Sequence, residues 1–197
     1  MPKTEDIFRT DATKRFPPPV NDELTEVNDL GLLYHEEKRF DKSLEQFWTG
    51  LKRSRELGYR EWESIALNNI GMVYQSWGKC DQALKFYHQS LQVAKEIGFL
   101  KGESAAYQHL GRIYDLWGQV NKSLQYYELS LKISDKTNDL PNKRTSMLNM
   151  AHCYEKLGNY GQCEKILNEV IKIDEVISHP DLATDHAYLE RLKVKGL

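Results

Sequence analysis

Hydrophobic and small residues recur at a spacing of 40 positions through most of this 197-residue chain. Within each block they follow an i, i+3, i+4, i+7 pattern, which is typical of one face of an amphipathic helix. The four blocks align without gaps at Val27, Leu30, Gly31 and Tyr34; Leu67, Ile70, Gly71 and Tyr74; Tyr107, Leu110, Gly111 and Tyr114; and Met147, Met150, Ala151 and Tyr154. The pattern predicts a first helix in every block.

A second helical stripe follows the first in each block, so each block is expected to form a helical hairpin. Its members are Ser43, Leu44, Phe47 and Leu51; Ala83, Leu84, Tyr87 and Leu91; Ser123, Leu124, Tyr127 and Leu131; and Cys163, Leu167 and Ile171. We expect the glycine or alanine of the first helix to face the serine, alanine or cysteine of the second. Small side chains on both sides would let the two backbones approach closely.

Turn residues also repeat between the stripes. A glycine follows the first helix where a left-handed backbone often ends a helix, at Gly78, Gly118 and Gly158, whereas the first block has Lys38. The second helix is expected to end at Gly58, Gly98 and Asn138 for the same reason. Side-chain oxygens are expected to cap the start of the second helix at Asp41, Asp81 and Asn121, with Gly161 as a weaker equivalent.

One hairpin cannot bury its own apolar face, so neighbouring hairpins are expected to stack into a superhelix. The predicted repeats span residues 21–58, 61–98, 101–138 and 141–176. Residues 1–20 are expected to form an extended tail, because Pro17, Pro18 and Pro19 favour a polyproline-like backbone. Residues 178–196 are expected to form a C-terminal capping helix that begins around Ser178 to Pro180 and carries an apolar stripe. That stripe consists of Leu182, Leu189 and Leu192.

The segments LNNIGMVYQSWGKCDQALKFYHQSLQVA and YQHLGRIYDLWGQVNKSLQYYELSLKI resemble the tetratricopeptide repeat (TPR) motif. The usual TPR period is about 34 residues, and the longer spacing here is similar to that of the Pins/LGN-type and rapsyn-type adaptors. The resemblance implies an all-α, right-handed superhelix of four hairpins plus the capping helix. It also implies a concave groove that binds a peptide or a helical segment of a partner protein, as an adaptor or scaffold does.

In a TPR superhelix the first helices line the concave wall, and their spacing indicates which residues would meet a partner. We call this set the groove row: Asn28, Leu32, His35, Asn68, Met72, Gln75, Gln108, Arg112, Asp115, Leu148, His152 and Glu155. Amides suit the donors and acceptors of a peptide backbone, and Arg112 could hold a carboxylate by two hydrogen bonds. The clamp of Lys and Asn that holds chaperone C-termini is not present, because Asn28 and Leu32 stand at its first positions.

Composition narrows the classes of partner. The net charge of −2 and pI near 6.3 argue against nucleic acid. No apolar run approaches the roughly 18 residues that span a membrane, and residues 1–20 lack the apolar stretch of a secretory signal. Three cysteines favour reduced thiols. We therefore expect a cytoplasmic protein that does not insert into membranes, with association with the cytoskeleton or a cilium as an open option.

We expect no enzyme activity, because no metalloprotease, P-loop, dinucleotide or paired Cys-x-x-Cys motif is found. No cofactor and no metal are expected. Cys153 and His152 point about 100 degrees apart on a helix and cannot act together, so Cys153 and Cys163 are interpreted as core residues. A metal site at His109, His152 and Asp115 has no supporting spacing.

Other surfaces and roles stay open. Phe86 and Tyr126 could form an exposed aromatic surface on the convex side. A basic patch could face an acidic partner or a microtubule; it consists of Lys52, Arg53, Arg55 and Arg60. The chain could also be a permanent subunit of a cytoskeletal or ciliary, axonemal assembly, or a peptide-regulated sensor. The sequence specifies neither the partner nor the oligomeric state.

Overall fold

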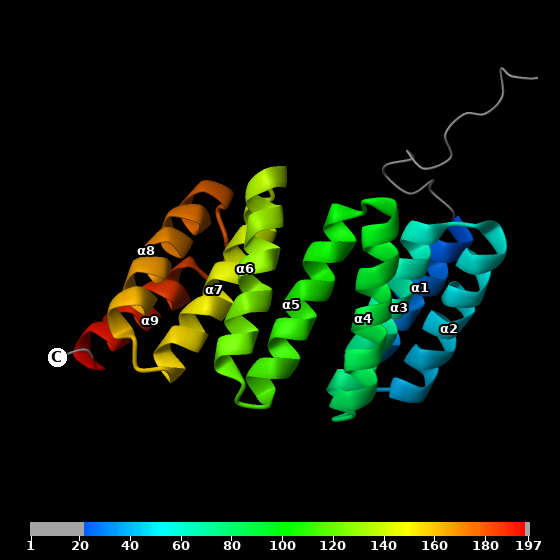
Figure 1. The fold of residues 1–197 in the computed structure, drawn as a ribbon, viewed down its shortest axis with the longest axis horizontal. Helices are drawn as coiled ribbons and strands as arrows, with labels where there is room; N and C mark the ends of the chain where they lie inside the picture. Colours follow the sequence, from blue (N-terminus) through cyan, green and yellow to red (C-terminus); the bar gives the residue numbers. More distant parts are fainter. Residues whose placement is uncertain (1–21, 196–197) are drawn as a thin grey trace, which may run out of the picture.

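The structure is a computed structural model that describes residues 22–195, so the tail predicted for residues 1–20 lies outside the described residues. This range forms nine α-helices joined by short turns, in the order that Figure 1 shows. They are α1 (Asp22–Glu36), α2 (Phe40–Leu57), α3 (Arg60–Ser76), α4 (Cys80–Ile97), α5 (Leu100–Leu116), α6 (Val120–Thr137), α7 (Leu140–Lys156), α8 (Tyr160–Ile177) and α9 (Leu182–Lys195).

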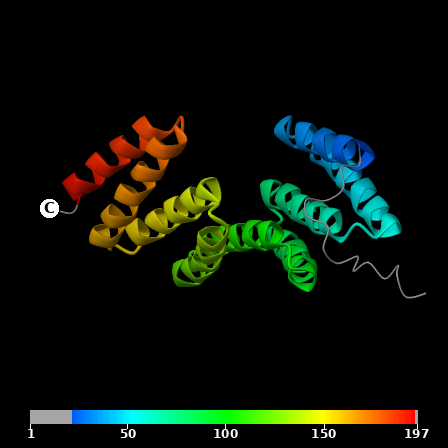
Figure 2. The ribbon, with the colours of Figure 1, turned by 90° about the horizontal axis from the view of Figure 1, so that it is seen from above.

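The helices pack in consecutive pairs along an arch (Figure 2). Along the series α1, α3, α5 and α7 the backbone of each helix closely approaches that of the next, whereas the backbones of α2, α4, α6 and α8 do not approach one another within residues 22–195. The odd-numbered helices are therefore closer together and form the inner wall of the arch. The prediction of an all-α array with four hairpins and a capping helix is confirmed.

The glycine of each first helix lies against an aromatic ring of the second helix. A Cβ atom added at Gly71 would lie 2.6 Å from Cε1 of Tyr87, and Gly31 and Gly111 meet Phe47 and Tyr127 in the same way. A side chain at these glycines would overlap the ring. In the fourth block Leu167 replaces the ring, and Ala151 is accommodated in the same buried cluster.

In the first block the facing small residue contacts the glycine backbone, but an aromatic ring fills the space above the glycine. The Ser43 hydroxyl donates to the carbonyl oxygen of Gly31 over 2.8 Å. The expectation that two small columns alone set the close approach is therefore corrected. The ring needs the missing Cβ atom, and in the first block Ser43 also bonds to the glycine backbone.

The predicted left-handed turns are present. Gly78, Gly118 and Gly158 have φ angles of 78°, 71° and 69°. Lys38 takes the same conformation with a φ of 59°, although it carries a side chain. Gly58, Gly98 and Asn138 end α2, α4 and α6 in the left-handed region, as expected.

The predicted caps of the second helices are wrong. Helices α2, α4 and α6 begin one residue before Asp41, Asp81 and Asn121, so these side chains lie within the first turn. A capping residue must stand just before the helix, with a non-helical backbone. In the fourth block Asn159 occupies that place and accepts from the backbone N–H of Gln162 over 3.2 Å, rather than Gly161.

The C-terminal helix α9 covers the fourth hairpin, and its Leu189 and Leu192 are buried as predicted. Ser178 does not start this helix but ends α8, with a φ of 53°. The side chains of Arg144, Asp174 and Asp185 join α7, α8 and α9 in a buried ion-pair cluster. Charge pairing, in addition to apolar contact, therefore holds the capping helix.

Candidate functional site

The groove row lies on the odd-numbered helices, with three residues on each of α1, α3, α5 and α7. Arg112 and His152 are exposed, and the other ten residues are half-buried. Because the odd-numbered helices contact each other along the inner wall, the row spans successive repeats.

Several residues of the row are hydrogen-bonded to the next odd-numbered helix, and the repeat pattern of the sequence did not predict these bonds. Asn69 donates to Oδ1 of Asn28 over 2.8 Å, and His35 Nε2 lies 2.8 Å from the Ser76 hydroxyl. Both pairs join α1 to α3. In both pairs the residues are 41 positions apart, one more than the repeat, and this spacing is the sequence signal that could have revealed them.

The same kind of bond joins α5 to α7. Lys156 Nζ donates to the two carboxylate oxygens of Asp115 over 2.7 and 2.6 Å, again across 41 positions. Gln108 donates to the Ser146 hydroxyl over 3.1 Å. These row residues hold repeats together.

At the C-terminal end of the row, α9 contacts the side chains of α7. Glu155 accepts from the Tyr188 hydroxyl over 2.7 Å and pairs with Arg191. The His152 ring stacks on Tyr188 with centroids 5.0 Å apart, and partial desolvation of the ring lowers the pKa of His152 although the residue as a whole is exposed. Both residues are thus engaged by the capping helix.

The junction of α3 and α5 differs. The Oδ1 atom of Asn68 is buried and has no hydrogen-bond partner among the described residues. Arg112 is exposed and forms no ion pair within residues 22–195. These two residues combine a free acceptor and a free cation on the inner wall.

His109 lies beside this junction. Its ring stacks on Tyr87 with centroids 4.8 Å apart and an angle of 6° between the planes. Burial, together with the nearby charge of Arg112, lowers the pKa of His109 to about 4, so the ring is neutral at physiological pH.

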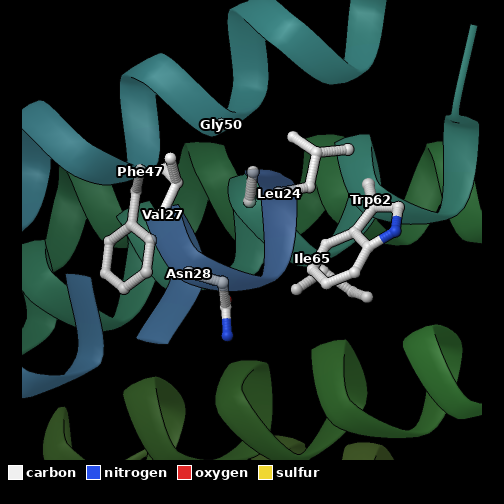
Figure 3. Close-up of a pocket in the computed structure, with 8 residues that line it drawn as sticks. Leu24, Val27, Asn28, Phe47, Gly50, Trp62 and Ile65 are labelled. Carbon is white, nitrogen blue, oxygen red and sulfur yellow. The ribbon is translucent and has the colours of Figure 1, made fainter. Parts of the chain in front are cut away.

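An apolar pocket lies where α1, α2 and α3 meet (Figure 3). Leu24, Val27, Phe47 and Trp62 are among its lining residues, and Asn28 is its one contributor from the groove row. The pocket reflects packing between the first two repeats, and the other eleven residues of the row do not line it.

Residues 23–96 and 78–136 match one model of the tetratricopeptide repeat, and residues 145–176 match a second. The chain belongs to the tetratricopeptide repeat family. Membership implies protein–protein interaction, and the TPR fold is typically non-catalytic. No curated protein matches the chain significantly.

Solved structures share the TPR fold at low sequence identity. BtubC (BKLC) from P. vanneervenii is 21% identical with a TM-score of 0.66, over 79% of this chain and 65% of BtubC. The putative kinesin light chain TPR-like repeats from Podosopora anserina are 18% identical with a TM-score of 0.68, over 86% of this chain and 84% of that one. RapI in its apo form is 16% identical with a TM-score of 0.74, over 88% of this chain and 48% of RapI. The chain thus spans less than two thirds of BtubC and about half of RapI, and these matches show the fold alone.

Phe86 and Tyr126 of this TPR chain do not form a free aromatic surface, contrary to the option raised from the sequence. Phe86 stacks on Tyr74 with centroids 5.4 Å apart, and Tyr126 stacks on Tyr114 at 5.3 Å. Trp48 of the preceding repeat also meets Phe86 edge to face at 5.5 Å. These rings stabilise the packing within the second and third hairpins and between the first and second.

The predicted basic patch is largely neutralised. Arg53 pairs with Glu23 at 3.0 Å, and Arg55 and Arg60 both pair with the buried Glu63. An acidic partner would have to compete with these intramolecular pairs, so this patch is a poor candidate site.

Cys153 and Cys163 are buried core residues, as interpreted from the sequence, and burial raises the pKa of both thiols. Within residues 22–195 no group of three or more His, Cys, Asp or Glu side chains could hold a metal ion. None of the helices in this range is long and apolar enough to cross a membrane.

Proposed function

We propose that this chain is a protein-interaction adaptor or scaffold that binds a peptide or helical segment of a partner along the inner wall of its arch. The observation that carries the proposal is a pair of groups at the α3–α5 junction, the buried Asn68 Oδ1 without a hydrogen bond and the exposed Arg112 without an ion pair within residues 22–195. A buried acceptor without a hydrogen bond costs about 1–3 kcal/mol, and a segment that supplies the missing donor would recover part of that energy. The resemblance in repeat length to Pins/LGN-type and rapsyn-type adaptors agrees with this role.

Apolar contact would add to the polar contacts. Leu32 and Met72 are half-buried and pack against the core cluster of the first two repeats. A thioether is unbranched and adapts to varied shapes. The wall therefore offers apolar surface on α1 and α3 next to hydrogen-bonding groups on α3 and α5.

The proposal is tested by affinity purification from native cell extract with the wild type and with the double variant Arg112→Glu, Asn68→Ala, each followed by mass spectrometry. A specific partner should be retained by the wild type and lost by the double variant. The double variant should keep the helical circular dichroism of the wild type and melt at the same temperature or higher, because neither side chain makes a bond within residues 22–195 that holds the fold. A matched control is Lys132→Glu, an exposed charge change on α6, which should retain the partner. Retention of the same partner by the double variant would overturn the proposal that the partner binds along the inner wall.

A further inference from the structure

Hydrogen bonds between successive odd-numbered helices form a ladder along the inner wall. Asn28 is bonded to Asn69 on the next such helix, and Gln108 reaches α7 by its bond to Ser146. Asn68 is the residue of α3 equivalent to these two, and the spacing of 41 predicts His109 as its partner. That bond is absent, so within the described part of the chain the ladder is interrupted between α3 and α5.

The contacts of Tyr87 on α4 with α3 and with α5 explain the interruption. The His109 ring lies flat on Tyr87, and the Tyr87 hydroxyl donates to Gln75 Oε1 over 2.7 Å. Gln75 is equivalent to His35, which bonds across repeats. Its cross-repeat position is taken by Leu116, which is 60% exposed and cannot accept or donate through its side chain. Both of these cross-repeat hydrogen bonds are therefore absent between α3 and α5, whereas equivalent bonds join α1 to α3 and α5 to α7.

Two groups at the α3–α5 junction, Asn68 Oδ1 and the guanidinium of Arg112, would bind different parts of a ligand. Asn68 Oδ1 is buried and needs an N–H or O–H donor. Arg112 on α5 occupies the repeat position of Met72, which lies one helical turn after Asn68 on α3. The planar guanidinium of Arg112 can bind a carboxylate by two hydrogen bonds. The two acidic residues of the row are already paired, Asp115 with Lys156 and Glu155 with Arg191. The net charge that the row offers to a partner is therefore the positive charge of Arg112.

We propose that the α3–α5 junction is the anchor of the groove and that it selects a protein segment carrying an Asp or Glu side chain, whose carboxylate pairs with Arg112. The same segment donates a backbone N–H to Asn68 Oδ1. This inference rests on the proposed function, since it names the chemistry of the segment that the groove takes. The carboxylate belongs to a side chain within the segment. A C-terminal carboxylate is the alternative source, and the experiment distinguishes the two.

The probe is a random-peptide library displayed on phage, with the peptide fused to the coat protein at its C-terminus so that no free carboxylate is present. The full chain is used as bait in three forms: wild type, Arg112→Glu and the control Lys132→Glu. Wild type and control should enrich peptides with an acidic residue at one fixed position. Arg112→Glu should enrich a basic residue at that position, because the charge it faces has been reversed.

The strongest wild-type peptide is then synthesised with an amidated C-terminus, and its affinity is measured by calorimetry. Arg112→Glu should weaken binding about tenfold or more, and Asn68→Ala about threefold to tenfold, the loss expected for one hydrogen bond each to a charged and a neutral group. Asn68→Ala should melt at the same temperature as the wild type or higher, because it removes an unsatisfied buried acceptor. A purely structural role of Asn68 would instead lower the melting temperature.

The changes in the amide chemical shifts of the full chain on adding the same peptide show which of the two proposals fails, the acidic anchor or the groove as the binding site. Some enriched peptides could change the amide shifts of the odd-numbered helices but lack an acidic residue, or bind Arg112→Glu as tightly as the wild type. Either result would overturn the acidic anchor but not the groove as the binding site. Binding only by a peptide with a free C-terminus would overturn the side-chain source. Shifts confined to α2, α4, α6 and α8, or no enriched peptide at all, would overturn both proposals.

Discussion

Arg144 on α7 donates from Nη2 to Oδ2 of Asp185 on α9 over 2.6 Å, across 41 positions of the chain. This is the separation that joins Asn28 to Asn69 and Asp115 to Lys156. Helix α9 therefore meets α7 as the first helix of a fifth repeat would. The glycine position of the repeat is taken by Arg191 and the following tyrosine position by the exposed Val194, so α9 offers no small-residue column for a further helix.

Asp185 should make the stability of the chain depend on pH. Burial raises the pKa of Asp185 to about 6, and Asp174 adds to the rise while Arg144 opposes it. The pKa is higher in the folded chain than in the unfolded chain, about 3.9, so protonation favours folding. This contribution is fully present below pH 4 and is lost as the pH rises through 6.

The measurement compares the melting temperatures of the wild type and Asp185→Asn between pH 4 and pH 7. Asparagine keeps an acceptor for Arg144 but does not titrate. Relative to this variant, the wild type should gain about 1–3 kcal/mol as the pH falls from 7 to 4. Asp181→Asn is the control, because Asp181 is exposed and lies 3.5 Å from Arg144, and it should follow the wild type. Parallel curves for wild type and Asp185→Asn would show that Asp185 does not titrate in this range.

Gly71→Ala should destabilise the chain by about 1–3 kcal/mol, because the new Cβ atom would lie 2.6 Å from the Tyr87 ring. Gly161→Ala is the control: it lies within α8, nothing lies within 4 Å of its added Cβ atom, and it should be neutral or slightly stabilising. Urea unfolding gives both values.

The contact can also be isolated by a double-mutant cycle with Tyr87→Leu, which copies the leucine that faces Ala151 in the fourth block. The cost of Gly71→Ala should be smaller in the Tyr87→Leu background. An equal cost in both backgrounds would mean that the ring does not set the requirement for glycine.

The fold was predictable because the residues that build it repeat. Each ring at Phe47, Tyr87 or Tyr127 requires a missing Cβ atom opposite it, and each left-handed turn favours glycine. Such needs are local and identical in every block, so they appear as sequence columns. The helix caps were mispredicted because a shift of one residue moves Asp41 from the cap into the first turn.

The candidate site was predictable only as a set of positions. The spacing placed the twelve residues on the odd-numbered helices, but a polar residue there can bond across repeats or remain free. Asn28 and Asn68 occupy equivalent positions, yet one is bonded and the other is not, because the residue 41 positions later is Asn69 in one case and the stacked His109 in the other. That outcome depends on Tyr87, which belongs to a different helix.

His109 should oppose folding under acidic conditions. Its pKa is lowered to about 4 in the folded chain and is about 6.5 in the unfolded chain, so the unfolded chain binds the proton first. The stabilising effect of neutral His109 is fully present above pH 6.5 and is lost as the pH falls towards 4. His109→Phe keeps a ring on Tyr87 without a titrating group.

The wild type should therefore lose about 2–3 kcal/mol relative to His109→Phe between pH 7 and pH 4, as followed by melting temperature. His186→Gln, a change at an exposed histidine on α9, should behave as the wild type. If His109→Phe and wild type respond to pH alike, His109 is accessible to protons in the folded chain, and the stacked arrangement is wrong.

Lys38→Gly should stabilise the chain by about 1 kcal/mol. Lys38 has a φ of 59°, in the region where a side chain is strained and glycine is not. Its backbone N–H bonds to His35 and that of Arg39 bonds to Tyr34, the same two bonds that Gly78 and Lys79 make at the end of α3. The substitution therefore preserves the turn and removes only the strain, and the exposed lysine side chain makes no hydrogen bond within residues 22–195 that would be lost. Gly78→Lys is the reciprocal change and should cost about as much as Lys38→Gly gains, both measured by urea unfolding. A loss of stability in Lys38→Gly would mean that the lysine contributes more to the first turn through its side chain than its backbone costs.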